Sequence, residues 1–190
     1  MKATSIESFF HKQPELSQLK EKKMELHTEI IGRGLKIIMF EDADGKKCSI
    51  QESSSDGSSK IWFGTYEATV QDHDGNPVSL PKDWSSLGRM HLSQRSVDWL
   101  ITILYRFNNN VDIRERTFAD SYGDDCSIKN SLSFGNPKIW LGNHNVSFAE
   151  DSEIKHLPNG LSAFARMHLD QELVAQLIPF LKRFIQTGEL

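Results

Sequence analysis

The chain has 190 residues, 38% of them hydrophobic and 25% charged, which is typical of one globular domain or two small ones. Its formal net charge of -4 excludes a general surface for neutralising the phosphates of nucleic acids. The sequence contains no apolar run long enough to span a membrane and begins without the apolar core of a signal peptide. We therefore expect a cytoplasmic protein without membrane contact.

Residues 1–32 are predicted to form a helical N-terminal extension. Residues 4–7 have the form of a capping box, and Pro14 opens a second predicted helix that ends at Glu29. In the first helix an apolar cluster has the spacing i, i+3, i+4 and consists of Ile6, Phe9 and Phe10. This cluster resembles the peptide by which partners bind sliding clamps, although Ala3 replaces the usual Gln. The alternative is that the cluster packs on its own domain.

The rest of the chain is a tandem duplication. Residues of the first copy recur 78 positions later, and after one deleted residue the offset becomes 77. The repeated positions include Phe40, Asp42, Cys48 to Ile50, Lys60 to Trp62 and Arg89 to Leu92, which return as Phe118, Asp120, Cys126 to Ile128, Lys138 to Trp140 and Arg166 to Leu169. We therefore expect two units, residues 33–110 and 111–190.

In the first copy, short apolar and β-branched runs predict strands at residues 35–40, 47–51 and 60–66, and a fourth strand that ends at Leu92. Residues 72–77 are predicted to reverse the chain as a hairpin. Ser93 is predicted to cap a helix that runs to about Phe107 and carries one apolar stripe. The fold class is therefore α+β, with each unit a β-meander of about four strands closed by a C-terminal helix.

The second copy repeats this pattern, with strands expected around Phe118 and at residues 126–129, 138–142 and 166–169. Asp170 is predicted to cap the last helix. Pro179 is expected to kink that helix, and Gly188 to end it.

The two cysteines, Cys48 and Cys126, occupy the same place in each copy. Each is predicted to lie in the middle of a strand, next to an apolar isoleucine. Two buried free thiols are therefore favoured over a disulfide between the copies.

Alternation along the strands divides the repeated residues between two faces of each sheet. The face that meets the helix is predicted to carry Cys48, Ile50, Ile61, Phe63, Met90, Leu92 and their counterparts. The other face is predicted to be a binding surface, because Trp and Arg are residue types in which binding energy concentrates. Its candidate binding residues are Lys60, Trp62, Arg89 and His91 in the first copy and Lys138, Trp140, Arg166 and His168 in the second.

Three interpretations of this surface stay open. The two units could pack sheet against sheet and bury the tryptophans, or the surface could bind a partner protein. It could also bind a nucleotide or a single-stranded nucleic acid, because Trp and Arg suit base stacking and phosphate binding. The sequence has no convincing catalytic, metal or cofactor motif, so we expect a protein that is not an enzyme, with no cofactor and no metal.

The pieces Cys126 to Ile128, Lys138 to Gly142, Arg166 to Leu169 and Leu181 to Leu190 resemble small accessory proteins of tailed bacteriophages and prophages. The resemblance covers the second copy well, the first less closely, and residues 1–32 not at all. It implies a phage-type product acting in the cytoplasm of a host bacterium, and it transfers no catalytic residue. The resulting expectation is a non-enzymatic binding protein that inhibits or sequesters a host protein, such as a component of host defence.

Overall fold

The computed structural model describes residues 26–53, 57–79, 81, 85–86, 88–131, 135–144, 146, 148–150, 153–155 and 157–190. The predicted helices within residues 1–25, and with them Ile6, Phe9 and Phe10, lie outside this described part.

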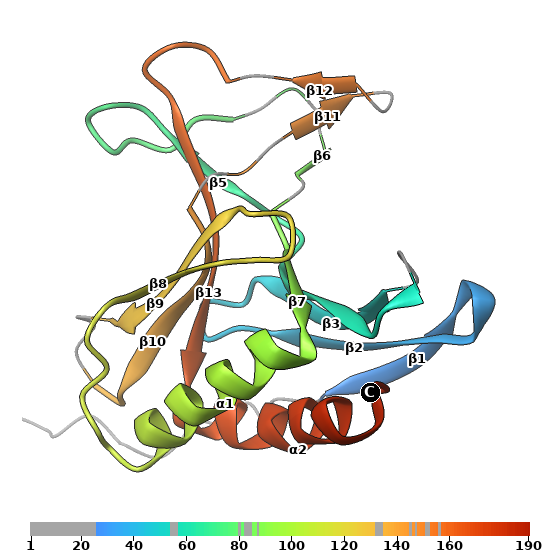
Figure 1. The fold of residues 1–190 in the computed structure, drawn as a ribbon. Helices are drawn as coiled ribbons and strands as arrows, with labels where there is room; N and C mark the ends of the chain where they lie inside the picture. Colours follow the sequence, from blue (N-terminus) through green and yellow to red (C-terminus); the bar gives the residue numbers. More distant parts are fainter. Residues whose placement is uncertain are drawn as a thin grey trace, which may run out of the picture.

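The chain forms an α+β fold with two five-stranded antiparallel sheets and two helices among the described residues (Figure 1). The first sheet has the order β1-β2-β3-β4-β7, with strands at His27–Ile31, Leu35–Glu41, Lys47–Ser53, Lys60–Thr65 and Met90–Ser93. The second has the order β5-β13-β10-β9-β8, with strands at Thr69–Gln71, Ser162–Asp170, Lys138–Asn143, Asp125–Asn130 and Arg116–Ala119. Helices α1 and α2 span Gln94–Asn108 and Gln171–Thr187.

The duplication is visible in the order of these elements. The series β2-β3-β4-β7-α1 recurs as β8-β9-β10-β13-α2, with the same neighbours in each sheet. Each sheet has one additional edge strand, β1 in the first and β5 in the second. Four strands of each five-stranded sheet, and the helix that follows them, therefore occur in the same order in both halves of the chain.

The prediction that the second N-terminal helix reaches Glu29 is wrong at its end. Residues His27–Ile31 form strand β1, which pairs with β2 through a short turn at Gly32–Gly34. Thr28, Ile30 and Ile31 are β-branched and favour a pleated strand over a helix. Pairing with the edge of a preformed sheet thus decides the conformation of this segment.

Both helices begin at the predicted caps, because the side chain of Ser93 accepts from the backbone N–H of Ser96, and that of Asp170 from Leu173. Helix α2 continues through Pro179 as one element. Pro179 is exposed, so the carbonyl that loses its helical partner can bind water. Gly188 ends the helix in the left-handed conformation, as predicted.

One hydrophobic core is shared by the two copies. The predicted inner-face residues of both sheets are buried together with the apolar stripes of both helices. The helices lie side by side below the sheets in Figure 1 and pack on each other. Because a unit of this size buries little surface by itself, a shared core explains how two such units become stable.

Reciprocal hydrogen bonds join the helices end to end in opposite directions. The Nε2 of Gln94, in the first turn of α1, donates to the carbonyls of Phe184 and Ile185 near the end of α2. Gln171, its counterpart in α2, donates to the carbonyl of Phe107 near the end of α1. The carbonyls of Phe184 and Phe107 also accept from the backbone N–H groups of Gly188 and Asn110, so each glutamine adds a second bond at the end of the opposite helix.

The turn after the first strand of each copy binds the last strand of the other copy. Asp42 Oδ2 accepts from the backbone N–H of His168 (3.0 Å), and Asp120 Oδ2 accepts from that of His91 (2.9 Å). The backbone N–H of Ala43 donates to the carbonyl of His168. The two copies are thus connected by hydrogen bonds as well as by the core.

The segments between the third and fourth strands of the two copies form a separate layer, in the upper part of Figure 1. Its three-stranded sheet has the order β12-β11-β6, at Glu153–Lys155, Phe148–Glu150 and Ser85–Ser86. A second small core lies here, formed by Val70, Val146, Phe148, Ala163 and Ala165. The predicted reversal at residues 72–77 is confirmed, because the N–H of Asp72 donates to the carbonyl of Asn76.

No helix among the described residues is long and apolar enough to cross a membrane.

The two cysteines are buried free thiols, as predicted. Burial raises the pKa of both Cys48 and Cys126 to about 12, so that the reactive thiolate is rare near neutral pH. We expect neither thiol of the folded protein to react with iodoacetamide, and both to react in guanidinium chloride. Intact mass measurements would show the number of adducts, and rapid alkylation of the folded protein would contradict the burial.

Candidate functional site: two rows of side chains

The predicted binding surface is organised around a cross-strand pair in each sheet. Trp62 on β4 lies opposite His91 on β7, and their rings stack with centroids 4.3 Å apart. Trp140 on β10 lies opposite His168 on β13, and these rings stack at 4.1 Å. Direct cross-strand neighbours on one face of a sheet are close enough for such stacking.

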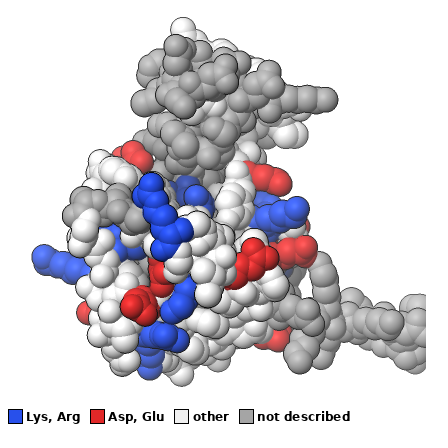
Figure 2. Space-filling view, turned by 90° about the vertical axis from the view of Figure 1, so that its right-hand side faces the viewer, with Lys and Arg blue, Asp and Glu red and all other residues white. Residues whose placement is uncertain are grey.

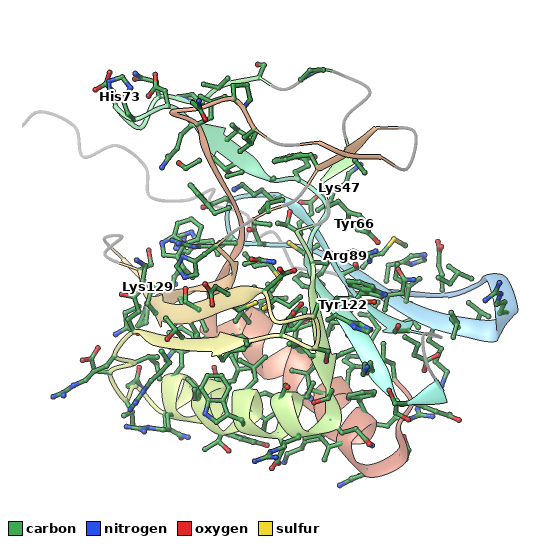
Figure 3. All side chains as sticks on the ribbon, turned by 45° about the horizontal axis from the view of Figure 1, so that its top comes forward. Lys47, Tyr66, His73, Arg89, Tyr122 and Lys129 are labelled. Atoms are coloured by element: carbon green, nitrogen blue, oxygen red, sulfur yellow. The ribbon has the colours of Figure 1, made fainter. Side chains whose placement is uncertain are left out.

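In the first copy this pair belongs to a group of five neighbouring side chains, which we name the first row: Tyr66, Arg89, Trp62, His91 and Tyr122. The rings of Trp62, His91 and Tyr122 form a triangle, because those of Trp62 and Tyr122 are also only 5.7 Å apart. Arg89 lies over the rings of Tyr66 (4.9 Å) and Trp62 (5.8 Å). Tyr122, from the first turn of the second copy, stacks on the outer side of His91 at 4.7 Å. Figure 3 shows Tyr66, Arg89 and Tyr122 one after another in the middle of the molecule.

Arg89 has only neutral partners among the described residues. Its Nη1 donates to Gln51 Oε1 (2.9 Å) and Ser49 Oγ (3.3 Å). The guanidinium is partly removed from water, and this burial lowers its pKa. A desolvated charge without a counter-charge carries a free-energy cost that an incoming carboxylate would offset.

The second copy has residues at the corresponding strand positions, which we name the second row: His144, Arg166, Trp140, His168 and Asp44. Here the guanidinium of Arg166 lies over the ring of Phe164, at 5.1 Å. Arg166 Nη2 donates to His144 Nδ1 at 2.6 Å. Burial, and then the positive charge of Arg166, lower the pKa of His144, so that the imidazole is neutral when it accepts this bond. At the other end, His168 Nδ1 lies 2.9 Å from Asp44 Oδ1 of the first copy.

The rows differ at positions that the duplication allowed to diverge. Tyr66 and His144 each follow the repeated tryptophan by four residues, and Asp44 and Tyr122 each follow the repeated turn aspartate by two. The first row ends in two exposed tyrosines, with 41% of Tyr66 and 62% of Tyr122 accessible to solvent. The second row ends in ionisable groups that contact their own neighbours. The first row is therefore the more open to a partner.

The structure places the eight predicted site residues in three kinds of environment, of which the two rows contain two and the lysines occupy the third. The tryptophans and arginines are half-buried, whereas the histidines, predicted on an exposed face, are only 1% and 4% exposed. The reason is that Tyr122 covers His91, and Asp44 contacts His168, across the boundary between the copies. The histidines thus form part of the contact between the two copies.

Lys60 and Lys138 lie apart from the rows. Each lines a pocket next to the C-terminal end of a helix, of about 390 Å³ for Lys60 and about 310 Å³ for Lys138. These two pockets are equivalent in the duplication, because Gly188 and Glu189 of the first correspond to Val111 and Asp112 of the second.

Sequence reasoning missed the residues at the ends of the rows: Tyr66, Tyr122, His144 and Asp44. The predicted residues are those identical in both copies, and these four positions are not identical. Their equal distances from repeated residues were the available signal. Only the packing of one copy on the other shows that a turn residue lies beside a histidine of the opposite copy.

In the first copy, Ser49 and His91 have different hydrogen-bond partners. The hydroxyl oxygen of Ser49 accepts from Arg89, and Nε2 of His91 lies 2.9 Å from Ser53 Oγ, so Ser49 and His91 do not form a nucleophile–base pair. Among the described residues, no group of His, Cys, Asp and Glu could hold a metal ion.

No protein-family model matches the chain, and comparisons with curated proteins and with solved structures give no significant match.

Proposed function

We propose that the chain is a non-enzymatic binding protein that recognises a partner protein through the first row. The observation that carries the proposal is the packing of Tyr66, Arg89, Trp62, His91 and Tyr122 in the first row. The two tyrosines of this row are exposed, and its arginine has no counter-charge among the described residues. Tyr, Trp and Arg are the residue types that dominate binding energy at protein interfaces. The partner recognised in this way presents a carboxylate to Arg89, with apolar side chains around it against the tyrosines.

The geometry gives less support to the alternative of a nucleotide or single-stranded nucleic acid on the same surface. A base needs a free aromatic face, and one face of each tryptophan is taken by a histidine. Figure 2 shows basic and acidic side chains interspersed on the visible face, without the continuous basic field that a phosphate backbone requires. An interface with a protein makes neither demand.

Resemblance to phage accessory proteins supplies the proposed context. In that context the partner is a protein of the host bacterium, and occupying its surface inhibits or sequesters it. Neither inhibition nor sequestration needs catalysis, so the contacts of the first row are sufficient for either role.

A photo-crosslinking amino acid at Tyr66 or Tyr122, incorporated in living bacteria that express the full chain, tests the proposal. We expect both positions to give the same protein adduct, identified by mass spectrometry. Tyr105 on α1 is the matched control, because 36% of its surface is exposed and it lies on a helix outside the row. The adduct should disappear when Arg89→Gln is added. Equal yields from Tyr105, or an adduct unaffected by Arg89→Gln, would contradict the proposal.

A further inference from the structure

A second site lies away from both rows, where helix α1 ends and the second copy begins. Here a cavity of about 300 Å³ is lined by Ile103, Arg106, Asp112, Ile113, Arg114 and Arg116. The arginines come from three different places: the last turn of α1, the connection that follows it, and the first position of β8. Ile103 and Ile113 are buried and form an apolar floor beneath these charges.

The positive charge of this cavity is not balanced by the described residues. Arg106, Arg114 and Arg116 are exposed, and no described carboxylate lies within ion-pair distance of any of them. The one acid in the lining, Asp112, is hydrogen-bonded by the side-chain amide of Asn130. Glu115, between two of the arginines in sequence, pairs instead with Lys129 at 3.5 Å. Three arginines therefore face one lining carboxylate, and the excess positive charge favours the binding of a further anion.

Guanidinium groups favour phosphate over other anions in this arrangement. Each presents a planar fork of donors that matches two oxygens of a phosphate. Three forks from separate elements can address the oxygens of one tetrahedral group from different sides, whereas a carboxylate has only two oxygens. The cavity volume is at the lower end of the range for small-molecule sites.

The same place in the first copy is used differently. Arg106 corresponds to Arg183 and Arg114 to Lys36, but Arg116 corresponds to the buried Ile38. The amine of Lys36 donates to the carbonyl of Leu190 at 2.8 Å, so this cation already has a hydrogen-bond partner within the chain. Among the described residues, three arginines line a cavity at the end of α1 but not at the end of α2.

We propose that this cavity binds the phosphate group of a small phosphorylated ligand. The site is independent of the first row, and its failure would leave the proposed partner binding untouched. The net charge of -4 favours a small ligand over a nucleic-acid strand.

Calorimetric titration of the full chain at low salt with inorganic pyrophosphate, adenosine monophosphate and a short oligothymidylate tests this proposal. We expect saturable binding of pyrophosphate and of the monophosphate. Arg114→Gln and Arg116→Gln should each weaken that binding by about tenfold or more, because a hydrogen bond to a charged group is lost. Both arginines are exposed, so the variants should fold, and thermal unfolding would verify it.

Arg95→Gln is the matched control, because it removes the same charge from an exposed position at the other end of α1. Its affinity for pyrophosphate should equal that of the unchanged chain. Absence of saturable binding, an equal loss in Arg95→Gln, or binding of the oligothymidylate alone would overturn the proposal.

Discussion

Replacing Asp42 by alanine is expected to lower the free energy of unfolding by about 3 kcal/mol, because three backbone N–H groups lose a charged acceptor. Asp42 is 4% exposed and accepts from the N–H groups of Asp44, Lys46 and, across the copies, His168. Asp120 accepts from those of Tyr122, Asp124 and His91, so Asp120→Ala should have a similar effect. Urea unfolding followed by circular dichroism measures both.

The chain contains a matched control for this prediction. Asp72 makes the same local turn, with its Oδ1 accepting from the N–H groups of Asp74 and Asn76, but it lies at the surface and has no bond to the other copy. Asp72→Ala should therefore change stability much less. Equal effects at Asp42 and Asp72 would show that the bond between the copies contributes little.

The second large effect is expected at Gly142 of β10, which lies very close to the backbone of its paired strand β13. A Cβ at this position would lie 2.0 Å from the carbonyl oxygen of Ala165 and 2.7 Å from Cα of Arg166. These are backbone atoms of a paired strand, so relief requires β10 and β13 to separate. We expect Gly142→Ala to destabilise the protein by about 3 kcal/mol or more, measured by the same urea unfolding.

Gly64 is the corresponding glycine of the first copy and provides the comparison. A Cβ there would meet Cα of Arg89 at 3.0 Å, which a small shift can relieve. Gly64→Ala should therefore be the milder substitution. A Gly142→Ala protein as stable as Gly64→Ala would contradict the close approach of the strands.

Much of the fold follows from the sequence because it depends on local patterns. The stripe on α1, the caps at Ser93 and Asp170 and the burial of the predicted inner-face residues of β3 and β4 are all present. Each is fixed by residues within one or two turns or one strand of each other. The internal repeat then extends the same assignments to the second copy.

The parts that the sequence did not reveal depend on contacts between distant segments. The bond from His168 to Asp42 joins residues 126 positions apart, and it buries a histidine that strand alternation alone places on an open face. Strand β5 belongs by sequence to the first copy but pairs with β13 of the second. In the same way, β1 takes its conformation from β2 and not from the helix-forming residues before it. Local periodicity contains no information about such partners.

The same distinction decides which residues of the candidate site could be predicted from the sequence. Trp62 and Arg89 could be predicted because both copies keep them, and both lie in the first row. Tyr66 and Tyr122 could not be, because the second copy has His144 and Asp44 in their places. Because the copies diverged at these positions, the first row ends in two exposed aromatic side chains and the second row does not.

The most direct test of partner recognition by the first row is the dissociation constant of the full chain for the protein identified by crosslinking. We predict that Arg89→Gln raises this constant by roughly 30-fold, the equivalent of about 2 kcal/mol at an interface hot spot. Arg183→Gln, an exposed change on α2, should leave it unaltered. If Arg89→Gln binds as tightly as the unchanged chain while remaining folded, the first row is not the recognition surface.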